Sequence, residues 1–287
     1  MTSTAIDLSV VIVSFNARDH LERTLTAVEA DLVCLTSEVI VVDNSSDDGS
    51  AMLVRRRHPT VRLIENGSNR GYTAANNQGF AVAGGRYVLI LNPDATPAPG
   101  TLPALVSALD VRPEVGLASC RLVWPDGRTQ ANGARDWTLG ALLAEHSLPG
   151  LVLGRTWSRR HRTYAGWARD SERDVDVLPG SVLCVRRDVL ARVGGFDERL
   201  HLYFGEDEWC ARVRAAGYAV RYLPLGAVVH TEGVSARRVP ALARASYFDD
   251  MWRFAALRFG PGRARCLRTL LWPTRLALSL AARRPRR

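Results

Sequence analysis

The sequence contains no lysine, so all 38 of its basic residues are arginines, and its five cysteines are scattered without a Cys-x-x-Cys pair. An odd number of separated cysteines argues against a disulfide framework or a structural zinc site, and favours a reducing compartment. We expect no secretory leader, because the first apolar run is short and lacks a basic segment before it, and no membrane-spanning helix, because no apolar run reaches about 18 residues. These absences together predict a cytoplasmic protein.

Two phosphate-binding motifs are also absent, because neither G-x-G-x-x-G nor G-x-x-x-x-G-K-[ST] occurs. This excludes the glycine-rich cradles with which dinucleotide-binding and P-loop proteins hold phosphates. A sheet protein that binds a diphosphate without such a cradle needs another source of positive charge. A divalent cation such as Mg²⁺ or Mn²⁺, held by carboxylate oxygen, is the usual solution.

Apolar residues are plentiful, since 47% of the 287 residues are hydrophobic, which is enough for a sizeable core. The net charge of +9 is uneven: residues 235–287 hold 13 arginines against Asp249 and Asp250, and the remainder is slightly acidic. A near-neutral body with a basic end predicts docking of that end on an anionic surface. It argues against nucleic-acid binding by the body, because no nucleic-acid-binding motif accompanies the charge.

The first 95 residues alternate between short β-branched runs and amphipathic segments. Strands are expected at 8–13, 38–43, 61–65 and 86–91, with helices around 21–28, at 47–57 and at 72–83. Strands separated by helices of this length predict right-handed βαβ units and a Rossmann-like parallel sheet.

The pattern becomes less regular after Pro93. We expect strands at 116–120, 175–186 and 218–223, a helix at 206–216, and a mobile or acceptor-facing insert over 128–174. Beyond Pro240 the chain is predicted to be helical and basic. This gives one α/β domain over 1–239, with halves 1–95 and 96–239, and a basic helical tail over 240–287.

Polar residues follow three of the predicted strands: Ser14 and Asn16 the first, Asp43 the second, and Asn92 and Asp94 the fourth. In open α/β sheets a ligand lies beyond the carboxyl ends of the strands, so these side chains are candidates for one site. Turn formation and helix capping are the alternative at each single position. Asp94, directly after a buried strand and a proline, is the expected first metal ligand.

Seven segments occur in an order that resembles family 2 glycosyltransferases of the GT-A fold, particularly their bacterial rhamnosyltransferase-like branch. They are Val10–Asn16, Val41–Ser50, Asn69–Asn77, Leu91–Asp94, Gly194–Glu198, Glu206–Glu208 and His230–Ser235. The resemblance covers about residues 6–240. It implies a Rossmann-like mixed sheet flanked by helices, with 1–95 as the nucleotide-sugar half and 96–239 as the acceptor half.

The resemblance also implies roles for single residues. Asp43 matches the residue that contacts the base and ribose. Other polar residues would line the nucleotide-sugar pocket: Ser14, Asn16, Asn69, Arg70, Asn77 and Asn92. Asp94 matches the one carboxylate kept from a D-x-D metal motif, with Asn92 replacing its first member. His230 matches a histidine that reaches the metal or diphosphate, and Gly180 and Ser181 match the start of the acceptor wall.

The acidic run leaves the catalytic base open between two residues. An ungapped alignment with the family places Glu206 on the catalytic aspartate and Gly205 on an expected glutamate, whereas a one-residue gap would place Asp207 on the catalytic position. Glu206 shares a helical face with the apolar Trp209 and Val213, which favours it as the base. Glu208 is expected to point away and form a surface ion pair with Arg212.

The implied activity is metal-assisted, inverting transfer of a sugar from a nucleoside-diphosphate donor. Deoxythymidine-diphospho-rhamnose is the best single guess for the donor, and a hydroxyl of an envelope glycan or lipid-linked sugar for the acceptor. One alternative is a nucleotidyltransferase, although Ser14–Arg18 lacks the glycine- and lysine-rich loop that such an enzyme needs. Another is an inactive GT-A scaffold, because Asn92 and Gly205 each replace an expected acid.

The tail interleaves arginines with large apolar residues, among them Trp252, Phe254, Leu270 and Trp272. Basic amphipathic helices with aromatic residues lie in anionic membrane interfaces, which predicts a peripheral protein on the inner face of the plasma membrane. The alternative is a terminal helix that packs on the body and leaves its arginines in solvent.

Overall fold

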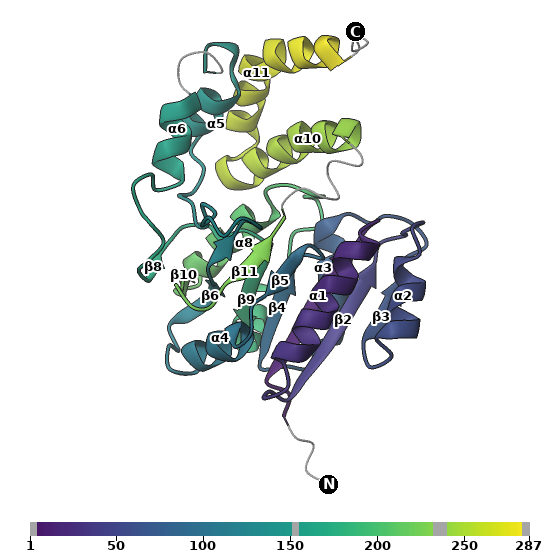
Figure 1. Cartoon of the computed structure of the whole chain (residues 1–287). Helices are drawn as coiled ribbons and strands as arrows, with labels where there is room; N and C mark the ends of the chain where they lie inside the picture. Colours follow the sequence, from purple (N-terminus) through teal and green to yellow (C-terminus); the bar gives the residue numbers. More distant parts are fainter. Residues whose placement is uncertain (1–4, 151–154, 232–239, 283–287) are drawn as a thin grey trace.

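The computed structural model describes residues 5–150, 155–231 and 240–282 (Figure 1). Its centre is an eight-stranded mixed sheet with the strand order β3-β2-β1-β4-β9-β6-β10-β8. The strands are β1 (Leu8–Ser14), β2 (Ser37–Asp43), β3 (Arg62–Glu65), β4 (Tyr87–Leu91), β6 (Val115–Ser119), β8 (Arg173–Asp174), β9 (Val182–Arg186) and β10 (Ala219–Tyr222).

Strands β1 to β4 are parallel and are joined by α1 (Arg18–Asp31), α2 (Ser50–Arg57) and α3 (Tyr72–Val82), as the sequence predicts. Successive side chains of a strand point to opposite faces, and here both faces are covered. On one face Val10 and Ile12 pack with α1, α2 and α4 (Thr101–Asp110). On the other face Val11 packs with α3, α7 (Arg187–Val193) and α8 (Gly205–Ala215).

Strand β9 runs antiparallel between β4 and β6 and joins the two halves of the sheet. The predicted strand over 175–186 is therefore too long: only 182–186 forms β9, because Pro179 and Gly180 interrupt the extended segment before it. A second sheet has the order β5-β11-β7, formed by β5 (Ala95–Pro97), β11 (Val228–His230) and β7 (Leu122–Val123).

The segment 128–174, expected to be a mobile or acceptor-facing insert, contains two helices, α5 (Leu139–His146) and α6 (Arg155–Arg162). Two C-terminal helices, α10 (Pro240–Phe259) and α11 (Pro261–Ala282), lie beside them (Figure 1). A third apolar cluster holds these helices together and joins them to the loop before α8. Its buried members include Trp137, Leu142, Leu200, Phe204, Met251, Phe254, Leu267 and Leu271.

A buried carboxylate anchors α10 to that loop. Asp250 is 0% exposed and accepts hydrogen bonds from the backbone N–H groups of His201, Leu202 and Tyr203, at 3.1, 2.9 and 3.1 Å. Arg253 donates to the same carboxylate at 3.1 Å. Hydrogen bonds to a charged group are among the strong ones in proteins, so α10 helps to fix the start of α8.

The outer face of α11 is basic and apolar. Leu270, Trp272 and Leu276 are 55%, 61% and 41% exposed, and the helix has four arginines and no acid. The alternative of a terminal helix that packs on the body therefore holds for the inner residues of the tail. The prediction of a basic amphipathic surface applies to the outer face of α11. Within the described ranges no helix is both long and apolar enough to cross a bilayer.

The packing of α10 predicts the stability of two matched variants. Phe254 is fully buried and stacks on Phe204 with the ring centroids 5.1 Å apart, whereas Leu270 on α11 is exposed. Phe254→Ala should lower the free energy of unfolding by about 3–5 kcal/mol through lost burial and a cavity. Leu270→Ala should change it by no more than about 0.5 kcal/mol. Denaturant unfolding measures both, and equal losses would contradict the packing of α10 on the body.

Candidate functional site

The ends of β1 and β2 place Ser14 beside Asp43, which are paired in the parallel register. Oδ1 of Asp43 accepts a hydrogen bond from the N–H of Ser46 at 2.9 Å. Its Oδ2 and the hydroxyl of Ser14 are buried and have no hydrogen-bond partner in the described part of the chain. Unpaired buried polar atoms are uncommon in folded proteins, so this pair fits a place where a ligand supplies the missing partners.

A buried amide organises the loop that follows β3. The side-chain amide of Asn44 donates to Oδ1 of Asn69 at 2.9 Å, and its oxygen accepts from the backbone N–H of Arg70 at 2.9 Å. The guanidinium of Arg70 is exposed beside this network. Asn44 was missing from the predicted site, although its place directly after Asp43 at a strand end was the available signal.

Asn16 and Asn77 are held in different surroundings. Asn16 has a left-handed backbone with φ 51°, and its Oδ1 accepts from the N–H of Asp47 at 2.9 Å, so it lies against the loop after β2. The amide of Asn77 bonds both the N–H and the carbonyl of Phe196, at 2.8 and 2.9 Å. It also donates to Glu198 at 3.0 Å. Asn77 thus joins α3 to the segment before α8. This structural role differs from the predicted place of Asn77 in the nucleotide-sugar pocket.

The predicted metal residues meet where β5 pairs with β11. Asp94 and His230 are both buried, with Asp94 Oδ1 3.6 Å from His230 Nε2. Asn92 Nδ2 lies 3.4 Å from the same ring nitrogen. The structure therefore brings His230 to Asn92 and Asp94, which lie more than a hundred positions before it in the sequence. Residues 232–235 of the motif that begins at His230 lie outside the described residues.

Gln130 sets the tautomer of His230. Its Nε2 donates to the carbonyl of His230 at 2.6 Å, which fixes the amide so that Oε1 faces His230 Nδ1 at 3.2 Å. Nδ1 then carries a proton, and Nε2 is the ring nitrogen that faces Asp94. An imidazole nitrogen and a carboxylate oxygen side by side fit a shared divalent cation. Gln130 was not predicted, because nothing local in the sequence marks it.

Asp94 and His230 alone would not make a complete metal site. Among the described residues no group of three His, Cys, Asp or Glu side chains converges as a metal site would require. Mg²⁺ and Mn²⁺ commonly take their remaining ligands from waters and substrate phosphates, so a two-residue site fits a cation that binds with its diphosphate.

The acid at the start of α8 faces Gly180. A Cβ added to Gly180 would lie 2.2 Å from both Glu206 Oε1 and the hydroxyl of Tyr72, so only glycine leaves room for these two groups. The Tyr72 hydroxyl donates to the carbonyl of Gly180 at 3.0 Å. Burial raises the pKa of Glu206 to about 7, and the nearby charge of Asp207 adds to this, whereas hydrogen bonds from the backbone and from Tyr72 oppose it.

Asp207 points into different surroundings. Burial raises its pKa to about 6, with Arg162 lowering the value and Asp136 raising it. The groups that act on it belong to the insert and to the segment before α5, rather than to the surroundings of Gly180. Of the two candidate bases, Glu206 is therefore the one that the structure places beside Gly180.

The pairing of β4 with β9 brings the two sides of the site together. The backbone N–H of Asn92 donates to the carbonyl of Ser181 at 3.0 Å, continuing the register in which Leu91 pairs with Val182. Gly180, beneath Glu206, thus lies across the strand pair from the segment that leads to Asp94. The buried hydroxyl of Ser181 has no partner in the described residues.

One prediction about α8 is wrong in part. Glu208 does pair with Arg212, at 2.8 Å, but it is only 8% exposed and not on the surface. Arg212 also donates to the carbonyls of Val193 and Gly195, the latter at 2.6 Å. The pair therefore holds the turn between α7 and α8, a contact between separate segments that helical spacing alone does not reveal.

Comparison with known proteins agrees with this geometry. The family model described as glycosyl transferase family 2 matches residues 9–175. An N-acetylglucosaminyl-diphospho-decaprenol L-rhamnosyltransferase of Mycobacterium tuberculosis is 33% identical over 95% of this chain and 91% of that protein. The O-antigen biosynthesis protein RfbC of Myxococcus xanthus is 31% identical over 83% of this chain and 18% of that protein.

Solved structures share the fold. A mannosyltransferase of Pyrobaculum calidifontis, in complex with GDP-Man and Mn2+, superposes with a TM-score of 0.61 at 21% identity, covering 99% of this chain and 77% of that one. The resemblance of the seven motifs to this family and to its rhamnosyltransferase-like branch is confirmed, and the nucleotidyltransferase alternative is set aside. The chain belongs to glycosyl transferase family 2 and is a glycosyltransferase of the GT-A fold.

Proposed function

We propose that this protein transfers a sugar, most simply rhamnose, from a nucleoside-diphosphate donor to a lipid-linked or envelope glycan by one inverting displacement. One observation supports the proposal: the paired ends of β4 and β9 set Asn92, two residues before Asp94, against Ser181, and the neighbouring Gly180 lies against Glu206. The donor class follows from the family, and the sugar and acceptor follow from the rhamnosyltransferase relative. Deoxythymidine diphosphate is the nucleotide proposed, as the usual carrier of activated rhamnose in the resembled branch.

The donor is proposed to lie along the ends of β1, β2 and β4. Asp43 and Ser14 would hydrogen-bond the nucleoside through the atoms that lack protein partners, and Asn16 and Asn69 would shape the loops around it. The exposed guanidinium of Arg70 is placed to meet a phosphate. Asn77 is proposed to support this pocket from behind, by fixing α3, rather than to touch the sugar.

Asp94 and His230 are proposed to hold a divalent cation, with Asn92 beside them. Mg²⁺ and Mn²⁺ both suit this oxygen and nitrogen donor pair, and Mn2+ is present in the mannosyltransferase neighbour. A cation bound there would offset the charge of the departing diphosphate.

Glu206 is proposed as the general base. It would accept the proton of the acceptor hydroxyl as that oxygen attacks the anomeric carbon, and Gly180 and Ser181 would form the wall on which the acceptor rests. A base works best when its pKa lies near the operating pH, and the pKa of about 7 for Glu206 meets this condition. The hydroxyl of Tyr72 lies beside this carboxylate over Gly180.

The first test compares the two neighbouring acids. Glu206→Gln should lower kcat for sugar transfer by about 10²–10⁴-fold, the usual value of a general base, and leave donor binding unchanged. Asp207→Asn, the matched control, should lower it by less than about tenfold, because Asp207 faces the insert. Product formation followed by released nucleoside diphosphate measures both. If both variants turn over like the wild type, the inactive-scaffold alternative or another base gains support.

The same assignment predicts the pH dependence of the wild-type enzyme. Only the ionised carboxylate accepts a proton, so kcat should rise as the pH increases through about 7, where Glu206 loses its proton. This rise of kcat with pH should be absent from the residual activity of Glu206→Gln. A rate profile between pH 5 and pH 9 checks this, and a wild-type rate that falls over this range would contradict the role of Glu206.

A second test addresses the cation. EDTA should abolish transfer, and added Mn²⁺ should restore it in the wild type. Asp94→Ala should need at least about tenfold more Mn²⁺, because one of two protein ligands is gone. Asp188→Asn, on the exposed start of α7, is the control and should behave as the wild type. Full activity of the wild type in EDTA would contradict the proposed cation.

The outer face of α11 is proposed to lie on an anionic membrane, where a lipid-linked acceptor would be met. Exposed Leu270, Trp272 and Leu276 would enter the interface, and the arginines of the helix would meet anionic headgroups. The inner face of α11 is already used in packing, so the docking surface is one side of the helix rather than the whole tail.

Liposome sedimentation tests this face. Trp272→Ser together with Leu276→Ser should reduce sedimentation with anionic vesicles by at least about fivefold, because much of the exposed apolar area is lost. Met52→Ser with Val111→Ser removes exposed apolar residues elsewhere and should have no effect. Point variants are preferable to deletion of the tail, because the deletion would also remove Asp250. Equal sedimentation of both pairs would contradict membrane docking through α11.

A further inference from the structure

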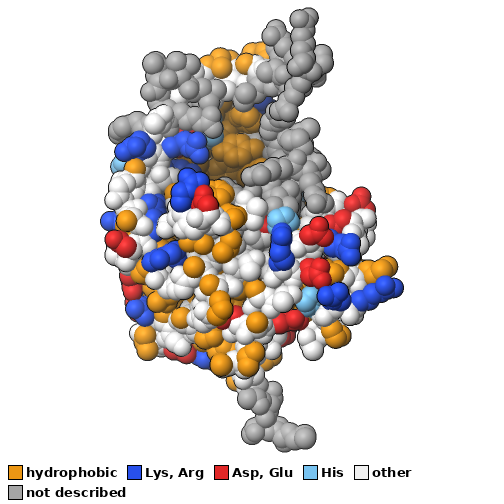
Figure 2. Space-filling model, viewed as in Figure 1, with side chains coloured by type: hydrophobic (Ala, Val, Ile, Leu, Met, Phe, Trp, Pro, Cys, Tyr) orange, Lys and Arg blue, Asp and Glu red, His pale blue; other side chains and the backbone are white. Residues whose placement is uncertain are grey.

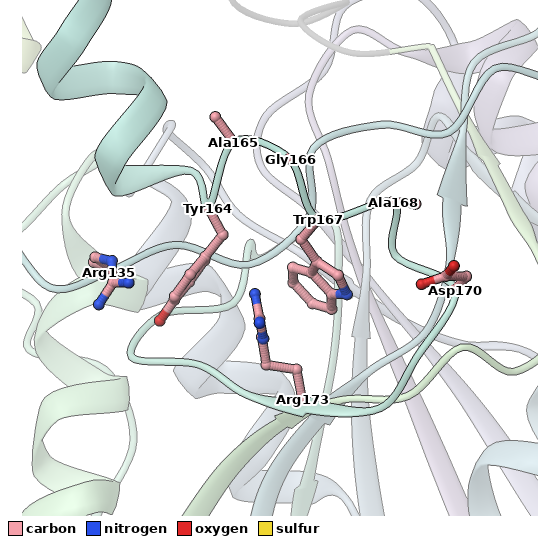
Figure 3. Close-up of a pocket in the computed structure, with 8 residues that line it drawn as sticks. All are labelled: Arg135, Tyr164, Ala165, Gly166, Trp167, Ala168, Asp170 and Arg173. Carbon is pink, nitrogen blue, oxygen red and sulfur yellow. The ribbon is translucent and has the colours of Figure 1, made fainter.

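A second pocket, away from the ends of β1, β2 and β4, is formed by the segment between α6 and β8. It has a volume of about 490 Å³ and is lined by Arg135, Tyr164, Trp167, Asp170 and Arg173 with three small residues (Figure 3). Figure 3 shows the guanidinium of Arg173 between the rings of Tyr164 and Trp167, with Arg135 on the other side of Tyr164.

A buried arginine fixes the loop that carries these rings. Arg169 donates to the carbonyls of Asn132, Trp167 and Thr163, at 3.2, 2.6 and 2.5 Å, and its own carbonyl accepts from Tyr222 at 2.8 Å. Tyr164 and Arg169 both have left-handed backbones, with φ of 50° and 60°. Such conformations persist only where the surroundings impose them, so the fold holds this loop in one defined conformation.

The arginines and rings alternate, which decides what the pocket can bind. Arg135 and Arg173 lie 4.6 and 5.2 Å from the centre of the Tyr164 ring, and Arg173 and Arg169 lie 4.8 and 4.6 Å from that of Trp167. The ring faces are therefore occupied and do not offer a platform on which a sugar stacks. What remains available is the in-plane N–H edge of the guanidinium groups, which matches phosphate oxygens.

Neither lining arginine forms an ion pair in the described part of the chain, although the carboxylate of Asp170 also lines the pocket. The acids on either side of Arg173 pair elsewhere: Glu172 with Arg112 at 3.0 Å, and Asp174 with Arg221 at 2.6 Å. Arg173 and Arg135 form no ion pair within the described part of the chain. The preceding helix, α6, adds four arginines and no acid, and arginine side chains gather on this side of the molecule (Figure 2).

The pocket is linked to the start of α8 through the chain that carries Arg135. Arg135 is followed by Asp136 and Trp137, and both of these act on Asp207, the neighbour of Glu206. A short stretch of chain thus runs from the guanidinium groups to the start of α8.

We propose that this pocket binds the diphosphate group of a lipid-linked sugar acceptor. The inference rests on the proposed transferase function, and on a relative whose acceptor is a sugar joined to a lipid by a diphosphate. The acceptor then has its own cationic site, because the cation at Asp94 and His230 serves the donor. Two planar guanidinium groups, preorganised on aromatic rings, suit a diphosphate better than flexible lysines would.

Calorimetric titration of the full chain tests the pocket with two probes, farnesyl diphosphate and inorganic pyrophosphate. Arg173→Gln should weaken the binding of both by about tenfold, because the recognised group is shared. Arg56→Gln removes the same charge from an exposed site on α2 and should leave both affinities within about twofold. Binding at the donor site is common to all three proteins and cancels in the comparison. Equal affinities of the wild type and Arg173→Gln overturn the assignment.

The two probes also separate the possible sources of the diphosphate. Tighter binding of farnesyl diphosphate than of pyrophosphate supports a lipid-linked ligand, and equal binding of the two overturns that part of the proposal. Arg173→Lys keeps the charge without the planar fork, so it should lose most of the binding while unfolding at the wild-type temperature.

These titrations need no sugar transfer, so the two proposals can fail separately. A protein that binds the probes through Arg173 but transfers no sugar would contradict the proposed function alone. A protein that transfers sugar, with Arg173→Gln binding both probes like the wild type, would contradict the pocket alone.

Discussion

The antiparallel insertion of β9 beside β4 is the constraint on which the site depends. A purely parallel sheet would bring only the carboxyl ends of its strands to one edge, and the acids of the second half would lie elsewhere. Because β9 begins where β4 ends, Gly180 and Ser181 face the segment that carries Asn92 and Asp94. Glu206 then needs only to reach over Gly180, where the missing side chain leaves it space.

Much of the nucleotide half could be predicted from the sequence, because the relevant signals are local. Four β-branched runs with helical segments between them dictate a parallel sheet, and the rule that ligands lie beyond strand ends selects Ser14, Asp43 and Asp94. The strand ends observed at β1, β2 and β4 match these expectations. The choice of Glu206 over Asp207 rested on the apolar stripe of α8, which the structure shows to be buried.

The features that could not be predicted arise from contacts between distant segments. Gln130 sets the tautomer of His230 from a hundred residues away, and Tyr72 reaches Gly180 across more than a hundred. Glu208 follows a simple helical ion-pair rule, yet it is buried because Arg212 also caps a separate turn. Local periodicity carries no information about such partners, so composition and spacing alone assign these residues to solvent or to no role.

Asp250 gives the C-terminal helices a second significance. Its carboxylate gathers three consecutive backbone amides directly ahead of the helix that bears Glu206, although it belongs to the part of the chain that is most basic and most peripheral. The tail is consequently not a targeting segment that could be exchanged freely between relatives. A chimera that exchanges the tail must also keep a carboxylate at the position of Asp250 and the loop before α8 that donates to it. The tail and this loop are therefore expected to diverge together among relatives.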